Sequence, residues 1–345
     1  MTAHRGPTAH TAGRRGRVDR WVSPVSTLSY LEAVVVGALQ GITELFPVSS
    51  LGHSVILPAL IGGSWAKDLD VSAPESPYLA FIVGLHVATA LALLLFLWRD
   101  WVRIIGGFFT SIRDRRIATD SQRLAWLIVL ATIPVGIAGL LLEHLFRTVL
   151  GKPMPAAAFL FANGLVLLLG ERLRRRAPVG VPAAPVSAPA DRSAGSAQAA
   201  DLDAGVEGPE ADLRSDQRLA TMTFKRGVVI GCAQILALLP GLSRSGVTMV
   251  VGLTQGLSHR DAARFSFLLA TPVIFAAGAL KVPNLVGPLG AGIHGQILAG
   301  SLASFICAYV AVRFLDRYFR TRTLVPFALY CLLAGAGSFL VLALR

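Results

Sequence analysis

The chain has 345 residues, of which 54% are hydrophobic and 15% are charged, and its mean hydropathy is +0.62. Soluble domains carry about 45–50% apolar and roughly 25% charged residues, so the composition argues against a soluble protein. The formal net charge of +12 would suit a protein that binds nucleic acid. The basic residues, however, flank long apolar runs, which excludes that class and favours a membrane protein.

Six uncharged apolar runs are long enough, or nearly so, to cross the hydrocarbon core of a bilayer, which takes about 20 helical residues. They are Leu79–Trp98, Leu124–Leu142, Ala156–Gly170, Phe265–Leu280, Ile297–Val312 and Leu324–Leu344. One soluble core cannot bury six such runs, so we predict an all-α polytopic membrane protein with about six spanning helices. A count of eight crossings stays open, because helix ends are hard to place from sequence.

The segments between these runs differ in their basic residues. Three connecting segments are rich in arginine and two are poor in it. The rich segments are 99–123, 172–226 and 313–322, and the poor ones are 64–78 and 143–155. Cytoplasmic loops carry the excess of Lys and Arg, so we predict that the rich segments face the cytoplasm. The arginine-rich N-terminus conflicts with this assignment, because counting the crossings back from the arginine-rich segments places the N-terminus on the opposite side of the membrane.

The composition also divides the chain into segments. Residues 177–221 consist mostly of Ala, Pro, Gly and Ser with scattered acidic residues, and such a segment buries too little surface to offset its ordering entropy. We therefore predict a flexible cytoplasmic loop between two membrane halves, residues 28–176 and 222–345. Residues 1–27 lack the apolar core of a signal peptide and are predicted to form a disordered arm.

The two halves contain related segments. Val34–Gln40 matches Val228–Gln234 at a constant offset, and the same offset pairs Ser49 with Ser243. Each copy is an apolar stretch that Pro, Ser and Gly interrupt before a second short apolar stretch. Interrupted segments at corresponding places in two halves indicate re-entrant helices. Since the basic loops place the two copies on opposite faces, we predict two re-entrant helix pairs in inverted-topology repeats.

The first interruption, Gln40–Ser54, contains a carboxylate, an amide, several hydroxyls and an imidazole. Such groups are costly at membrane depth, so a functional site is the first hypothesis. Gln40 and Glu44 lie one turn apart on the same helical face. A proline then ends that helix, which puts Ser49, Ser50 and His53 on the loop and at the start of the next helix. The alternative is an ordinary capped helix with Ser49 or Ser50 as its N-cap.

The second interruption centres on Arg244, whose planar five-donor fork suits bidentate binding of phosphate. Its neighbours add hydroxyls and backbone that can approach an anion. They are Ser243, Ser245, Gly246 and Thr248. A helix that starts there would also direct its N-terminus at the anion. The alternative is a buried structural ion pair between Arg244 and Glu44.

Both motifs resemble those of the undecaprenyl-diphosphate phosphatase family, membrane proteins associated with bacitracin resistance. The first looks like the pattern (E/Q)xxxE followed by PxSSxGH, and Pro240–Thr248 looks like PGxSRSxxT. Three further stretches are similar, namely Leu85-His86, Phe265–Pro272 and Arg313–Tyr330. The resemblance covers roughly residues 28–176 and 222–345. Gln40 stands where many members have Glu, and because an amide cannot act as a base, chemistry through the single carboxylate of Glu44 is implied.

The resemblance implies an acid-anhydride hydrolase that removes one phosphate from undecaprenyl diphosphate, a polyprenyl diphosphate lipid. Its product, undecaprenyl phosphate, would be reused in peptidoglycan synthesis, with consequences for cell-wall biogenesis, cell shape and bacitracin resistance. The family also implies a multi-pass protein of the bacterial plasma membrane with a site that faces the periplasmic side. A homodimer stays open. The rival from another class is a transporter of polyprenyl phosphate, since inverted repeats with broken helices also occur in transporters.

For hydrolysis, we expect Arg244 and backbone N–H groups to hold the phosphates and to stabilise transition-state charge. A divalent cation, Mg²⁺ or Ca²⁺, would be held by Glu44 and the substrate phosphates, because hard cations take oxygen ligands. Ser50 is predicted to be the nucleophile, with His53 as base and later as acid. The alternative is a water that His53 or Glu44 activates. The predicted phosphate-binding residues are Gln40, Ser49, Ser243, Ser245, Gly246 and Thr248.

Overall fold

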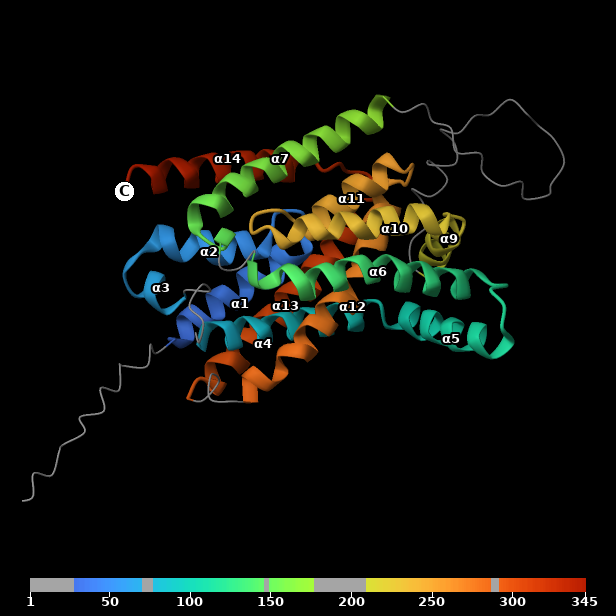
Figure 1. The fold of residues 1–345 in the computed structure, drawn as a ribbon, viewed down its shortest axis with the longest axis horizontal. Helices are drawn as coiled ribbons and strands as arrows, with labels where there is room; N and C mark the ends of the chain where they lie inside the picture. Colours follow the sequence, from blue (N-terminus) through green and yellow to red (C-terminus); the bar gives the residue numbers. More distant parts are fainter. Residues whose placement is uncertain (1–27, 70–76, 146–148, 177–208, 287–291) are drawn as a thin grey trace, which may run out of the picture.

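The computed structural model describes residues 28–69, 77–145, 149–176, 209–286 and 292–345, and every regular element within them is helical. The helices run alongside one another in an elongated bundle (Figure 1). In chain order they are α1 (Tyr30–Leu45), α2 (Ser50–Ile61), α3 (Gly63–Asp68), α4 (Pro77–Phe96), α5 (Trp98–Asp114), α6 (Asp120–Leu145), α7 (Pro153–Arg176), α9 (Pro209–Ala220), α10 (Phe224–Ala233), the 3₁₀ helix η2 (Gln234–Leu238), α11 (Arg244–Thr254), α12 (His259–Val286), α13 (His294–Tyr318) and α14 (Val325–Ala343). The predicted N-terminal arm, residues 1–27, lies outside the described residues.

Five of the described helices are long and apolar enough to cross a membrane, namely α6, α7, α12, α13 and α14. The number is seven if two bent pairs each form one span: α4 with α5, bent by 85°, and α9 with α10 and η2, bent by 102°. The prediction of an all-α, multi-pass membrane protein with about six spans is therefore confirmed. The arginine-rich connection after α4 is not a simple loop, because Trp98–Asp114 form the amphipathic helix α5, which packs against α6.

Two helical hairpins correspond to the interrupted segments. The first is α1 with α2, and the second is α10 and η2 with α11; α1, α2 and α11 have 16, 12 and 11 residues, each shorter than a bilayer requires. A Cβ at Gly37 in α1 would lie 2.2 Å from the carbonyl oxygen of Gly300 in α13, and one at Gly231 in α10 would lie 2.1 Å from that of Ala131 in α6. Gly37 and Gly231 are equivalent in the sequence repeat, so the repeat extends to helix packing.

The hairpins enter the bundle from opposite ends. α1 runs parallel to α13, since Gly41, one turn after Gly37, meets Ser304, one turn after Gly300. α10 runs parallel to α6 in the same way, because its earlier glycine, Gly227, meets the earlier Leu127. The end of α13 and the start of α6 lie at one end of the bundle, beside α9 and its ion pairs. The predicted inverted arrangement of the two hairpins is thus present.

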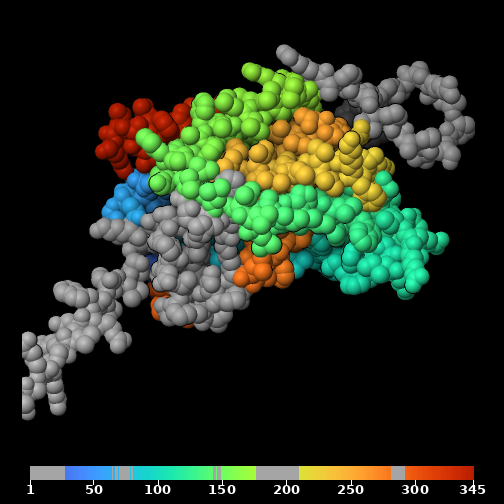
Figure 2. Space-filling model, in the orientation of Figure 1, coloured from blue at the N-terminus to red at the C-terminus, as the bar shows by residue number. Residues whose placement is uncertain are grey.

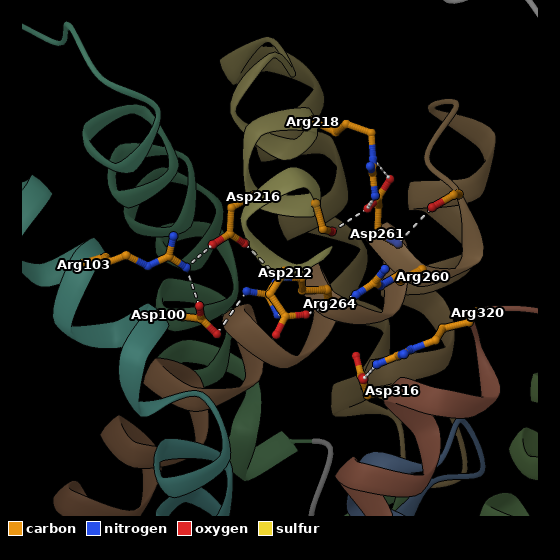
Figure 3. A network of polar contacts seen from close by, with 12 residues as sticks. Asp100, Arg103, Asp212, Asp216, Arg218, Arg260, Asp261, Arg264, Asp316 and Arg320 are labelled. Carbon is orange, nitrogen blue, oxygen red and sulfur yellow. Dashed lines mark hydrogen bonds and ion pairs between the residues drawn. The ribbon is translucent and has the colours of Figure 1, made fainter. Parts of the chain in front are cut away.

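A network of arginine–aspartate ion pairs joins α5, α9 and α12 at that end (Figure 3). Arg264, whose side chain is 4% exposed, contacts Asp216 at 2.7 Å, Asp100 at 3.0 Å and Asp212 at 3.2 Å. Arg103 lies 2.8 Å from the second oxygen of Asp216. The arginines of α5 and α12 thereby hold α9 against the bundle.

Helix α9 corrects the last part of the predicted flexible loop at 177–221. Pro209–Ala220 are ordered because Asp212, Ser215 and Asp216 recur on one helical face and find partners on other helices. The segment has few apolar residues, but ion pairs with distant arginines, which composition does not show, order its last part. Residues 177–208 lie outside the described residues, and that part of the prediction stays untested.

Candidate active site

The turn of the first hairpin is held by Ser49. α1 ends at Leu45, and Ser49 caps α2 with a φ of 70°, a conformation uncommon for residues other than glycine. Its Oγ accepts hydrogen bonds of 3.2 Å from the backbone N–H of Gly52 in its own hairpin and of Gly241 in the other. The Ser49 hydroxyl, predicted to bind phosphate, thus fixes the turn and ties the two hairpins together.

The second hairpin begins α11 with a similar cap. Ser243 Oγ accepts from the N–H of Gly246 at 3.2 Å. The hydroxyls of Ser243 and Ser245 both donate to the carbonyl of Phe46 in the first hairpin, at 3.3 and 3.0 Å. Thr248 donates at 2.7 Å to the backbone carbonyl one turn earlier. The structure places these four predicted phosphate-binding residues at the junction, where their polar atoms hold backbone in position.

Helix α7 supplies Asn163, a clamp that the sequence analysis missed. Its Nδ2 donates to the carbonyl of Pro47 at 2.9 Å, and its Oδ1 accepts from the N–H of Ser243 at 3.0 Å. The side chain is completely buried, and both ends of its amide are used, one on each hairpin. The available signal was an asparagine within the apolar run 156–170, since polar side chains in spanning helices are costly and tend to be functional.

Glu44, in the last turn of α1, joins the two hairpins through side-chain hydrogen bonds. Its Oε1 accepts a hydrogen bond of 2.9 Å from Arg244 Nη2. Its Oε2 accepts from Ser50 Oγ at 2.5 Å and from Gln40 Nε2 at 3.1 Å. The side chains of Glu44 and Arg244 are 8% and 12% exposed. The two interrupted segments therefore converge at the Arg244–Glu44 ion pair that the sequence analysis gave as an alternative, although 200 residues separate its members in the chain.

Two buried polar atoms of this cluster, Arg244 Nη1 and Gln40 Oε1, have no hydrogen-bond partner among the described residues. Leaving a buried donor or acceptor unpaired costs about 1–3 kcal/mol, so such atoms in a native protein call for an explanation. Nη1 is a cationic donor next to a carboxylate-bound Nη2, which suits an oxygen of a phosphate. Gln40 Oε1 is an acceptor, which suits a hydroxyl or a hard cation.

His53 follows on α2, but its ring is directed elsewhere. Its Nδ1 lies 2.6 Å from the carbonyl of Ser49 and must donate, which leaves Nε2 of the neutral ring to accept from the Tyr330 hydroxyl at 2.7 Å. The ring also stacks on Tyr330 of α14, with centroids 5.8 Å apart. Ser50, which the sequence hypothesis pairs with His53, donates a hydrogen bond to Glu44 instead.

A second imidazole, His86 of α4, lies closer to the carboxylate. Its Nδ1 lies 2.8 Å from the carbonyl of Ile82, so Nε2 is the free acceptor of the neutral ring. That Nε2 lies 3.3 Å from Gln40 Nε2 and 3.7 Å from Glu44 Oε2. The sequence analysis noted His86 only as part of the family resemblance. The signal for a site residue was an ionisable side chain in the middle of an apolar run.

The oxygen atoms of the cluster fit a hard cation that is shared with a substrate. Within the described ranges, no three or more His, Cys, Asp or Glu side chains are grouped as a metal site. The available oxygens are the carboxylate of Glu44, the hydroxyl of Ser50 and the unpaired Oε1 of Gln40. Mg²⁺ is usually bound by one or two carboxylates together with phosphates and water, and this donor set matches that pattern.

A buried carboxylate–arginine pair with an adjacent hydroxyl, set between two inverted re-entrant hairpins, is the candidate site of this polytopic membrane protein. The chain belongs to the family described as bacitracin resistance protein BacA, whose model matches residues 33–337.

Curated relatives match almost from end to end. A protein of Mycolicibacterium paratuberculosis is 67% identical over 320 residues, which are 92% of this chain and 99% of the relative. A protein of Frankia casuarinae is 53% identical, covering 90% of this chain and 98% of the relative. One of Burkholderia lata is 41% identical, covering 88% and 93%. The first is named undecaprenyl-diphosphatase, and the other two bear that name with a number, 1 and 2 respectively.

Proposed function

We propose that this protein hydrolyses undecaprenyl diphosphate to undecaprenyl phosphate and inorganic phosphate. It thereby returns the lipid carrier to peptidoglycan synthesis and confers resistance to bacitracin. The names and the end-to-end similarity of its relatives support this activity. The observation in the structure that carries the proposal is the buried cluster of Glu44, Ser50 and Arg244, in which one guanidinium nitrogen is unpaired.

In the proposed reaction, Arg244 holds the terminal phosphate. Substrate oxygens can approach the guanidinium of Arg244 beside Glu44, because Nη1 of this arginine has no partner among the described residues. The planar fork can then keep one nitrogen on the carboxylate while the other stabilises charge on the phosphoryl group. Binding of substrate and orientation of Glu44 are in this way linked through a single side chain.

Ser50 is the proposed nucleophile and Glu44 the base. Ser50 Oγ attacks the terminal phosphorus and passes its proton to Glu44, with which it already shares a hydrogen bond of 2.5 Å. The bond from that phosphorus to the bridging oxygen breaks, and undecaprenyl phosphate leaves with the proton that Glu44 had taken. Glu44 then takes a proton from a water that attacks the phosphoserine and returns it to Ser50 Oγ, which releases inorganic phosphate and restores Ser50. His53 assists by positioning the start of α2.

The alternative chemistry is direct attack by a water that Glu44 or His53 activates, without a phosphoserine. Acid quenching of the enzyme during turnover of terminally radiolabelled substrate separates the two. Label bound to Ser50 in the wild-type chain, and absent in Ser50→Ala, supports the covalent route. No protein-bound label at any time under turnover supports the direct route.

We propose that Mg²⁺ or Ca²⁺ takes part, held by Glu44 and the substrate phosphates, with Gln40 Oε1 as a further oxygen. When bound, such a cation would neutralise phosphate charge. The role of the chain's own residues is to present these oxygens beside Arg244. Removal of divalent cations with a chelator should abolish phosphate release, and added Mg²⁺ or Ca²⁺ should restore it.

The proposed location is the plasma membrane of a bacterium, with the site open to the periplasmic face. The α1–α2 hairpin enters from the end of the bundle opposite to the arginine-rich network, and arginine-rich ends of membrane proteins face the cytoplasm. The substrate would therefore reach Glu44 from the outer leaflet. A homodimer stays a prediction, which light scattering of the purified chain tests.

The decisive experiment measures phosphate release from a polyprenyl diphosphate by the purified full chain, with and without chelator. Glu44→Gln and Arg244→Lys are the site variants, and Arg320→Lys is the matched control, because it alters another arginine–carboxylate pair outside the site. Metal-dependent release that the site variants lose and the control keeps supports the proposal. Inverted hairpins also suit a transporter of polyprenyl phosphate; movement of that lipid across liposomes without phosphate release would favour this second function.

A further inference from the structure

An apolar groove of about 680 Å³ lies between α5 and α6, with Pro272 of α12 also in its wall. Figure 2 shows α5 and α6 next to each other at the surface of the bundle. The lining includes Ile105 and Phe109 from α5, and Val129, Ile133, Gly136 and Ile137 from α6. Neither re-entrant hairpin contributes to the wall, so the groove is distinct from the candidate active site.

The groove is open to the surroundings of a spanning helix. Residues 120–142 of α6 are long and apolar enough to cross the bilayer, and Phe109, Ile133 and Ile137 are 64%, 48% and 55% exposed. At membrane depth these side chains face hydrocarbon. The volume falls within the range of about 300–1,000 Å³ that is typical of small-molecule sites. Thr132 and Trp101 carry the polar side-chain atoms of the lining. The Thr132 hydroxyl donates to a carbonyl of its own helix, and Trp101 Nε1 is buried without a partner among the described residues.

Basic residues lie just beyond one end of the groove. Arg113 follows Phe109 by one turn on the same helical face, and Arg115 and Arg116 come directly after the end of α5 and are exposed. The pair between Arg113 and Asp114 is largely exposed, with the Arg113 side chain at 76%, and exposed pairs contribute little. Its guanidinium is therefore open to another anion.

We propose that this groove binds one acyl chain of an anionic phospholipid of the cytoplasmic leaflet, whose phosphate lies at Arg113, Arg115 and Arg116. The hydrocarbon chain matches a wall of mainly apolar side chains, in which Trp101 Nε1 is the one polar side-chain atom without a hydrogen-bond partner among the described residues. The head group matches the arginines, since basic residues at the cytoplasmic surface attract anionic lipids. A second copy of the chain fits less well, because an apolar interface at the groove would make no use of the exposed arginines at its end.

Binding of the lipid would have a structural effect on α5. One face of this helix lines the groove, and another carries Asp100 and Arg103, which join the ion pairs with α9 and α12. A chain in the groove fills the space between α5 and α6 and so stabilises α5 in the position in which those ion pairs form. The lipid and α9 thus act on opposite faces of the same helix.

Gly136 provides the sharpest variant. A Cβ added there meets no atom within 4 Å, so the leucine of Gly136→Leu has room to start into the groove, and the change also raises helix propensity. Gly139→Leu is the matched control, because Gly139 lies on the same helix, also has no atom within 4 Å of an added Cβ, and does not line the groove. Equal thermal stability of the two variants in phosphatidylcholine micelles shows that both are folded.

The experiment is native mass spectrometry of the full chain, titrated with dioleoyl phosphatidylglycerol or dioleoyl phosphatidylcholine. The wild-type chain should retain one phosphatidylglycerol in preference to phosphatidylcholine. Gly136→Leu should lose that molecule, and Gly139→Leu should keep it. Changing the three arginines to glutamine should remove the preference, at about fivefold in affinity per arginine.

Three results would overturn the proposal. Equal retention of phosphatidylglycerol by the wild-type chain and Gly136→Leu would mean that the groove holds no specific lipid. A dimer that is lost in Gly136→Leu would make the groove an interface between copies. Displacement of the retained lipid by undecaprenyl phosphate, one for one, would assign the groove to the isoprenoid tail.

Discussion

Replacing Arg244 with lysine keeps the positive charge and removes the planar fork, which makes it the most direct test of the site. In the structure, Nη2 of Arg244 contacts Glu44 at 2.9 Å, and Nη1 has no partner among the described residues. An arginine can therefore serve the carboxylate and a phosphate oxygen at the same time. A lysine has a single nitrogen on a flexible stem and cannot reproduce both directions.

The expected loss follows from the contact that lysine cannot make. A hydrogen bond to a charged group contributes about 1.5–3 kcal/mol, and about 1.4 kcal/mol corresponds to a factor of ten in rate. Arg244→Lys should then lower kcat/KM for a polyprenyl diphosphate by about 10- to 150-fold. If the lost contact forms only in the transition state, the decrease appears in kcat and not in KM.

The assay is release of inorganic phosphate by purified chains in liposomes, with Mg²⁺ titrated to saturation for each variant. Arg320→Lys controls for a general effect of exchanging arginine, because Arg320 pairs with Asp316 at 2.8 Å on α13. Thermal unfolding of both variants controls for folding. A value of kcat/KM for Arg244→Lys within about threefold of the wild-type chain would refute the reasoning, because 1.5 kcal/mol already corresponds to more than tenfold.

Further predictions concern the site, the Asn163 clamp and the segment that leads into α9. Glu44→Gln should lower turnover by about 10²–10³ at saturating metal, an effect of the size seen when a transition-state contact is removed, whereas Gln40→Glu should retain activity because the family pattern accommodates either residue. Asn163→Leu should lower the free energy of unfolding by about 2–6 kcal/mol, because two buried backbone groups each lose a partner at about 1–3 kcal/mol. Deletion of residues 179–208 should leave activity largely intact, whereas Asp216→Ala should lower the free energy of unfolding by about 1.5–3 kcal/mol, because Arg264 and Arg103 lose a charged hydrogen-bond partner and keep Asp100.

Each of these outcomes has a clear opposite. Near-normal turnover of Glu44→Gln would make Glu44 structural and leave the proton transfer to an imidazole. Denaturant unfolding of Asn163→Leu at the wild-type midpoint would show that the hairpins do not depend on the clamp. Loss of activity on deletion of 179–208, in protein that is inserted and intact, would give that segment a role that its composition does not predict.

The sequence predicted the spans and the hairpins because both leave a local trace. A run such as Leu124–Leu142 is apolar for the length of a bilayer, and the match of Val34–Gln40 with Val228–Gln234 exposes the repeat directly. Helix α9 left no such trace. This helix is held in place by ion pairs of Asp216 with Arg264 and Arg103. Because these partners are distant in the chain, composition alone predicted a loop at this position.

The sequence predicted which residues form the candidate site better than it predicted which of them form hydrogen bonds with one another. Glu44, Ser50 and Arg244 stood out because polar groups interrupt apolar segments, and the structure joins them. The choice of hydrogen-bond partner depended on side-chain directions, so Ser50 was paired with His53 although its hydroxyl donates to Glu44. Asn163 escaped notice because a clamp has no motif and can be recognised only from the two backbones that it joins.

The separation of 200 residues between Glu44 and Arg244 has a consequence for biosynthesis. Ribosomes add about 5–20 residues per second, so the arginine emerges roughly 10–40 s after the carboxylate. During that interval the first hairpin carries an acidic group without its counter-ion, which is costly in hydrocarbon. The hairpin can settle between its neighbours only when the second half has been inserted. The protein therefore becomes active only after its second half has been synthesised, and a truncated chain that reaches the membrane is inactive.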